Sequence, residues 1–163
     1  MTAPIAKAQM LIRKPVSEVF NAFIDPAITT RFWFTKSSGK LEAGKRLRWD
    51  WEMYGVHDDI EVKEIAKDKR ILMEWSFPNA NRVEWTFDAR PEGTLLSVVN
   101  GGFKGDDLVA QALDATQGFN IVLCACKVFL EHGIDPRFII DHAPDAIVKG
   151  GKSRRRSAQE AGS

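Results

Sequence analysis

The sequence crowds imidazole and carboxylate groups together at one place, His57-Asp58-Asp59. Such a group could bind a metal ion or transfer protons. If residues 56–62 form a strand, His57 and Asp59 share one face of it, and a third metal ligand would have to come from elsewhere in the chain. We favour the plainer interpretation, in which these residues are the solvated start of a strand.

Further carboxylates alternate with apolar residues along the predicted strands, so we expect them to face solvent. They are Asp50, Glu52, Glu61, Glu74 and Glu84. A cyclase-type acid–base site would instead need a carboxylate or histidine facing an apolar cavity, where desolvation raises a carboxylate pKa. The sequence contains no GxSxG elbow, no HExxH and no phosphate-binding glycine loop. We therefore predict no catalytic residue, no metal site and no cofactor.

Large aromatic and sulfur-containing side chains gather on one face of the predicted strands and on a predicted long helix after them. We predict that the following residues bind a ligand: Trp49, Trp51, Met53, Met73, Trp75, Phe77, Trp85, Phe87, Phe119 and Val122. The competing interpretation is a plain packed core, because aromatic stripes usually belong to the core. A sheet curved around one helix tends to leave space, however, and rings with methionines make an adaptable lining.

Period-two alternation of apolar residues predicts successive strands after residue 46. The alternating sets are Leu47/Trp49/Trp51/Met53, Ile60/Val62, Ile71/Met73/Trp75/Phe77, Val83/Trp85/Phe87 and Leu95/Ser97/Val99. Turn-rich breaks separate them at 66–69, 78–81 and 90–93. Short strands joined by tight turns indicate an antiparallel meander.

The remaining elements follow from proline positions and helical spacing. Residues 5–13 predict a first strand, and Pro15 then suits the first turn of a helix. A second short helix is predicted over about 26–33. From about residue 106 to 132, apolar residues recur every three or four positions, which predicts one long amphipathic helix that ends at Gly133. We expect residues 134–148 to pack onto the body in an irregular or short helical form.

The predicted order is a strand, two short helices, a run of strands and one long helix. The apolar face of these strands must pack against another apolar surface. The long helix is the one predicted element that offers such a surface. We therefore predict an α+β domain, in which a curved antiparallel sheet wraps around the long C-terminal helix.

The 163 residues suit a single domain, which we place at residues 1–148. Apolar runs are too short for a membrane span, and the start lacks the apolar stretch of a secretion signal. Cys124 and Cys126 are two positions apart in the predicted helix and point to different sides, so we expect buried free thiols. We expect a cytoplasmic protein without a membrane partner.

The formal net charge of +1 hides a basic C-terminus. Lys149, Lys152, Arg154, Arg155 and Arg156 stand there against the single acid Glu160. The segment has no large apolar residue to anchor it, so we predict that 149–163 is a disordered tail. The rest of the chain is mildly acidic and gives no electrostatic footprint for nucleic acid.

Four stretches of the chain carry a family resemblance: PVSEVFNAFIDPAITTRFWF (15–34), LEAGKRLRWDW (41–51), EVKEIAKDKRILMEW (61–75) and GFNIVLCACKVFLEHG (118–133). They resemble the START-like, or polyketide-cyclase-like (SRPBCC), superfamily, and within it the family similar to the activator of the heat-shock protein 90 ATPase. The family usually has tryptophan where Phe119 stands. The resemblance implies a helix-grip fold with an internal cavity, in a superfamily that ranges from lipid carriers through cyclases to co-chaperone domains.

We therefore expect the protein to bind a small hydrophobic or aromatic molecule between the sheet and the C-terminal helix. The alternative that the resemblance offers is a protein-interaction module that docks on a chaperone ATPase. A cyclase or hydrolase is the least favoured function, because no set of residues forms a catalytic motif. The sequence does not identify the ligand, and it leaves open whether the protein is a monomer or a homodimer.

Overall fold

The computed structural model describes residues 2–75, 80–149 and 154–156. Its helices are α1 (Val16–Ile24), α2 (Pro26–Thr29), α3 (Leu108–His132) and α4 (Phe138–Asp141), with 3-10 turns η1 (Glu52–Tyr54) and η2 (Pro144–Ala146). Its strands are β1 (Ala6–Ile12), β2 (Lys36–Ser37), β3 (Arg46–Trp51), β4 (Val56–Ala66), β5 (Arg70–Trp75), β6 (Asn81–Arg90), β7 (Gly93–Gly101) and β8 (Arg154–Arg155). The predicted α+β class and order of elements are confirmed.

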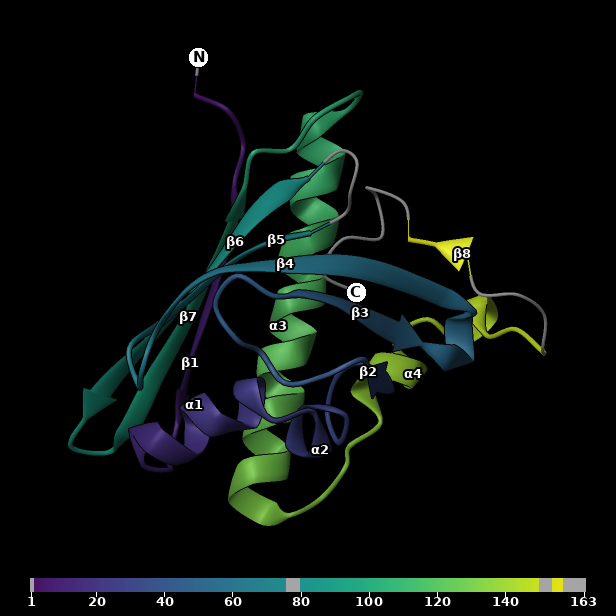
Figure 1. Ribbon diagram of the computed structural model, residues 1–163. Helices are drawn as coiled ribbons and strands as arrows, with labels where there is room; N and C mark the ends of the chain where they lie inside the picture. Colours follow the sequence, from purple (N-terminus) through teal and green to yellow (C-terminus); the bar gives the residue numbers. More distant parts are fainter. Residues whose placement is uncertain (1, 76–79, 150–153, 157–163) are drawn as a thin grey trace.

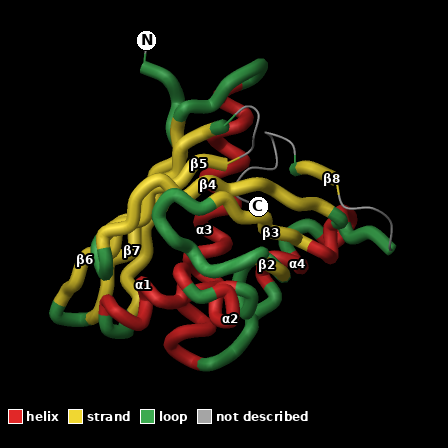
Figure 2. The backbone as a smooth tube through the Cα atoms, in the orientation of Figure 1, coloured by secondary structure: helices red, strands yellow, loops and turns green. Residues whose placement is uncertain are grey.

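The strands form one curved sheet that wraps around α3 (Figure 1). Their order is β1-β7-β6-β5-β4-β3-β2, and neighbours along this path are antiparallel. β1 pairs with β7 from Ala6↔Asn100 to Ile12↔Thr94, so the first strand extends the meander beyond its last one. Figure 2 shows the strands as one continuous layer, with α1 and α2 beside the end of α3. The predicted grip of a sheet around the long helix is confirmed.

The buried face of β7 differs from the prediction. β7 buries Thr94, Leu96, Val98 and Asn100, not the set Leu95/Ser97/Val99. Apolar residues occupy both faces of β7, so alternation alone could not select the buried one. In β5 and β6 the opposite face is polar apart from Leu72, and there the predicted inward positions are buried.

Met53 leaves the alternation that was predicted for it. β3 ends at Trp51, and residues 52–54 form the turn η1. Gly55 ends this turn at φ 61°, a left-handed conformation that glycine adopts without a steric cost. Met53 therefore lies off the strand and is only partly buried, whereas Tyr54 is buried.

The core is centred on Trp33, in the chain after α2. Its ring lies with centroids 5.0 Å from Trp49, 5.6 Å from Trp85 and 6.0 Å from Trp75. Phe119 joins these rings from the middle of α3, stacked on Trp75 at 5.6 Å and edge-on to Trp85 at 5.5 Å. Offset and edge-to-face contacts of this kind are favourable between aromatic rings. They fasten the long helix to the concave face of the sheet.

α3 begins and ends with defined caps. The Asp107 side chain accepts a hydrogen bond from the Ala110 N–H at 3.1 Å, and Gly133 ends the helix at φ 68°. An 18-residue window of this helix has a mean hydropathy of 1.3, so by length and composition α3 could span a membrane. The apolar stripe that gives this value packs on the sheet through Ala115, Phe119 and Val122, as expected of the core helix of such a fold.

The C-terminal residues contradict part of the prediction of a disordered tail. Arg154 and Arg155 form β8, which pairs in parallel with Val56 and His57 of β4. Arg156 follows and is 4% exposed. Residues 134–148 match their prediction, because they form α4 and η2 with Ile139 buried. Residues 150–153 and 157–163 of the predicted tail lie outside the described residues.

Glu131, near the end of α3, ties this helix to the end of β1. Its Oε2 accepts hydrogen bonds from the Arg13 N–H at 2.8 Å and the Lys127 ammonium at 2.6 Å. Burial pushes the pKa of Glu131 up, but these two donors outweigh it, so the pKa is lowered. The stabilisation is therefore present above the ordinary glutamate pKa and is lost as pH falls through the lowered value.

We predict that Glu131→Gln lowers the free energy of unfolding by about 1 kcal/mol at neutral pH, since a charged acceptor is lost. The difference from the wild type should shrink as the pH falls below about 4. Urea unfolding followed at several pH values measures both. Exposed Glu18 on α1 provides the control, as Glu18→Gln should change little. A Glu131→Gln difference that stays constant from neutral to acid pH would contradict the assignment.

Candidate functional site

The structure brings most of the predicted ligand-binding residues together, in a tightly packed cluster. Each of the following is at most 3% exposed: Trp49, Trp51, Met73, Trp75, Trp85, Phe87, Phe119 and Val122. Phe77 lies outside the described residues. The rings contact one another and Trp33 directly, so the described side chains fill much of the space between sheet and helix. That these residues bind a ligand stays a prediction.

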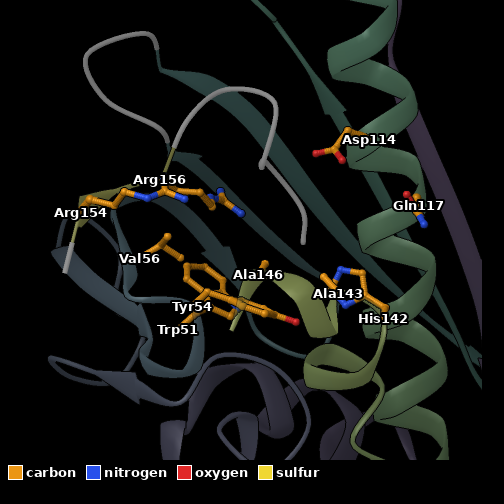
Figure 3. Close-up of a pocket in the computed structure, with 10 residues that line it drawn as sticks. All are labelled: Trp51, Tyr54, Val56, Asp114, Gln117, His142, Ala143, Ala146, Arg154 and Arg156. Atoms are coloured by element: carbon orange, nitrogen blue, oxygen red, sulfur yellow. The ribbon is translucent and has the colours of Figure 1, made fainter. Parts of the chain in front are cut away.

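A pocket lies beside this cluster, between α3 and the residues at the end of β3, in η1 and at the start of β4. It has a volume of about 270 Å³. Its lining residues within the described part of the chain come from four segments: Trp51, Tyr54 and Val56; Asp114 and Gln117; His142, Ala143 and Ala146; Arg154 and Arg156. Figure 3 shows them converging on one space, with the Asp114 carboxylate pointing from α3 toward the strands. Of the ten predicted residues, Trp51 lines this pocket, and Met53 lines a separate one near α4.

Tyr54 forms the floor of the pocket and holds the C-terminal segment in place. Its hydroxyl donates a hydrogen bond to the Ile139 carbonyl and lies 3.3 Å from the Ile140 carbonyl. The His142 ring stands edge-on to the tyrosine ring, with centroids 6.3 Å apart. Burial raises the pKa of Tyr54 to about 12, and the negative charge of Asp141 adds to this effect. The phenol is thus held neutral as a donor.

His142 is oriented by the same backbone carbonyl. Its Nδ1 lies 2.6 Å from the Ile139 oxygen, and because a carbonyl can only accept, Nδ1 must carry the proton. In the neutral ring this leaves Nε2 as a hydrogen-bond acceptor. The pocket therefore combines an apolar floor with an imidazole, a carboxylate and an amide, and it is not wholly apolar.

Asp58 was expected to lie at a solvated strand start, and this expectation is wrong. Its side chain is fully buried, on the same face of β4 as Val56 and Ile60. Its Oδ2 accepts a hydrogen bond of 2.7 Å from the guanidinium of buried Arg156. The signal in the sequence was the alternation itself, which places Asp58 among the inward-facing residues of that strand. His57 lies on the outer face, as does Asp59.

The other predicted outward carboxylates lie at or near the surface, with one exception. Asp50 is 9% exposed, and its Oδ1 accepts a hydrogen bond of 2.8 Å from Arg48. Glu61, Glu74 and Glu84 are partly exposed and form ion pairs, and Glu52 is exposed. Within the described residues, no three His, Cys, Asp or Glu side chains come close enough together to hold a metal ion.

Comparison with solved structures defines the class of fold. A Staphylococcus saprophyticus protein is 28% identical, with a TM-score of 0.73, over 82% of this chain and 96% of its own. DynU16, from the dynemicin biosynthetic locus, is 24% identical with a TM-score of 0.74, over 82% of this chain and 49% of its own. The Aha1 dimer from Colwellia psychrerythraea is 14% identical with a TM-score of 0.69, over 82% of this chain and 98% of its own.

The fold is thus the helix-grip fold of the START-like, polyketide-cyclase-like superfamily. Residues 13–131 match the family described as activator of Hsp90 ATPase homolog 1-like protein. The chain belongs to this family, which confirms the resemblance seen in the sequence. No curated protein matches the chain.

The raised pKa of Tyr54 can be measured directly, because the chain contains one tyrosine. We predict that tyrosinate absorbance in the near ultraviolet appears with a midpoint of about 12 in the folded protein. The urea-unfolded chain should titrate near 10.0. Since the folded form holds its proton longer, stability should fall as pH rises between these two values, and Tyr54→Phe should lack this part of the pH dependence. A folded midpoint near 10 would show that Tyr54 is solvated.

Proposed function

We propose that the protein binds a small aromatic or apolar molecule in the pocket between Tyr54 and α3. The observation that carries the proposal is the pocket itself, in which an aromatic floor faces convergent polar groups. Ligand sites in proteins combine these two features, because the apolar wall supplies affinity and a few polar groups fix orientation. Membership of a family whose fold is that of ligand-binding or interaction modules supports it.

The shape of the pocket limits the ligand. Ligand pockets usually have about 300–1,000 Å³, so a volume of about 270 Å³ favours a compound with a single ring. Trp51, Tyr54 and Val56 would cover its apolar part. His142 Nε2 could accept a hydrogen bond, and the Gln117 amide could donate or accept one. We therefore expect a ring compound that carries at least one polar substituent.

The test is a thermal-shift screen of phenols, aromatic acids, aromatic amines and short fatty acids, with native mass spectrometry of the protein as purified. A ligand at about 100 times its Kd should raise Tm by about 5–10 °C. The pocket assignment is then tested with Gln117→Trp, which places a large ring in the pocket. Asn120→Trp is the matched control, because Asn120 is an exposed position on the same helix.

For the compound with the largest shift, we predict at least a tenfold loss of affinity in Gln117→Trp and unchanged affinity in Asn120→Trp, both measured by calorimetry. Equal affinity in Gln117→Trp and the wild type would place the ligand elsewhere. A screen without any hit would remove the support for a small-molecule site and favour a protein partner.

A second candidate function is a protein-interaction module similar to the chaperone ATPase activator. Two large apolar side chains on α3 support it, because Val109 is 60% exposed and Leu113 is 67% exposed. A similar fold is known as a dimer, the Aha1 dimer of Colwellia psychrerythraea. Co-elution with Hsp90, and a change in its ATPase rate that Leu113→Ser abolishes, would support this function. Sedimentation at several concentrations tests self-association of the chain.

The least favoured function, a cyclase or hydrolase, has one supporting observation. The pocket lining includes a histidine and a carboxylate, His142 and Asp114. Acid–base chemistry needs such groups, and a wholly apolar lining would have argued against it.

A further inference from the structure

A buried ion pair lies at the edge of the pocket, between the sheet and the C-terminal strand β8. The Arg156 side chain is 1% exposed and that of Asp58 is 0% exposed. The guanidinium Nη2 lies 2.7 Å from Asp58 Oδ2. The other carboxylate oxygen accepts a hydrogen bond of 2.9 Å from the Asp59 N–H. The carboxylate is thus held in a fixed orientation by its own strand.

Two tryptophan rings form the walls around this guanidinium. Its central carbon lies 4.4 Å from the ring centroid of Trp75 and 4.9 Å from that of Trp51. Both distances are within the range of about 6 Å for a cation over an aromatic face. Two flat rings and one carboxylate surround a planar cation on several sides.

The Trp75 wall is itself held rigidly. Its indole Nε1–H donates a hydrogen bond of 2.7 Å to Asn81 Oδ1, which also accepts one of 2.6 Å from Asn100 Nδ2. The ring also stacks on Phe119 of α3. The carboxylate belongs to β4 and the two rings belong to β3 and β5. The Asp58 carboxylate and the Trp75 ring are also held by contacts that do not involve Arg156.

The cation, by contrast, comes from a short addition to the sheet. β8 occupies the edge of β4 beyond the point where β5 ends, at the pair Ile60↔Trp75. The Arg154 N–H donates to the Gly55 carbonyl and the Arg156 N–H to the His57 carbonyl, each at 2.8 Å. Arg154 and Arg155 are exposed, and Arg155 pairs with Asp59 on the outer face.

We propose that Asp58, Trp51 and Trp75 form a binding site for an organic cation of the guanidinium or amidinium type, and that Arg156 is its built-in occupant. A buried carboxylate requires a partner cation, and contact with two aromatic faces favours a flat one. The adjoining pocket, which Trp51 also lines, would take an apolar group attached to that cation. An external cation competes with Arg156 by displacing β8. The site shares Trp51 with the pocket of the proposed function, but it depends on Asp58 and Trp75, which do not line that pocket. Variants of Asp58 therefore test it separately from Gln117→Trp.

The first test uses the full chain with Arg156→Ala, which removes the built-in cation. Benzamidine, a flat aromatic cation, is compared with benzamide, its neutral counterpart of the same shape. We expect benzamidine at about 10 mM to raise the Tm of Arg156→Ala by about 3–5 °C, and benzamide to raise it by less than about 1 °C. Arg155→Ala is the matched control, and it should show no difference between the two compounds.

The second variant, Asp58→Asn/Arg156→Ala, removes both charges and should fold without a cation. In this variant benzamidine and benzamide should act alike. Equal effects of the two compounds on Arg156→Ala would show that the site does not distinguish a cation from a neutral molecule, which overturns the proposal. A preference for benzamidine that survives Asp58→Asn would overturn it as well. If Arg156→Ala does not fold alone, its refolding yield in the two compounds is compared in the same way.

Competition in the wild type is read from hydrogen exchange at the amides of Arg154 and Arg156. We expect exchange at both amides to become at least about threefold faster as benzamidine displaces β8, and to stay constant in benzamide. Arg156 is tethered to the chain and so competes at a high effective concentration. The benzamidine titration therefore extends to about 100 mM. Exchange rates that do not respond to benzamidine over this range would show that Arg156 is a permanent structural anchor, which overturns its role as a displaceable occupant.

Discussion

The contact between Phe119 of α3 and the rings of the concave sheet is the interaction on which the rest of the structure depends. Phe119 stacks on Trp75 and meets Trp85 and Trp33 edge-on. Because interiors are close-packed, rings of this size leave little space in the middle of the grip. The pocket lies beside these rings, where α3 faces η1, the segment 142–146 and residues 154–156 (Figure 3).

A second constraint is electrostatic, and it explains why the C-terminal residues join the fold. β4 turns Asp58 inward, and a charge buried in this position is costly unless a partner lies against it. Arg156 supplies the opposite charge, and β8 supplies backbone hydrogen bonds that bring it there. A basic segment without large apolar residues is thus anchored by one buried side chain. The same two rings and carboxylate account for the cation site that we propose.

Sequence periodicity predicted the fold well because one face of most strands is polar and the long helix carries a single apolar stripe. It failed at β7, where both faces carry apolar residues, and at Met53, which lies in the turn η1 after the strand has ended. Of the predicted residues that the structure describes, Trp51 alone lines the pocket near α3. Most of the other described lining residues come from α3, from residues 142–146 and from residues 154–156. Their convergence depends on how these segments pack on η1, which no local pattern encodes.

The central claim is that the middle of the grip is a closed core and that the space for a ligand lies beside it. Hydrogen exchange of the five indole N–H groups tests this most directly. Those of Trp33, Trp51 and Trp85 are buried without an acceptor among the described residues. The account predicts that Trp33 and Trp85 exchange only through global unfolding, and that Trp51, beside the pocket, exchanges at least about tenfold faster through local opening. If Trp33 and Trp85 exchange as fast as Trp51, the ring cluster itself opens to solvent and the claim is wrong.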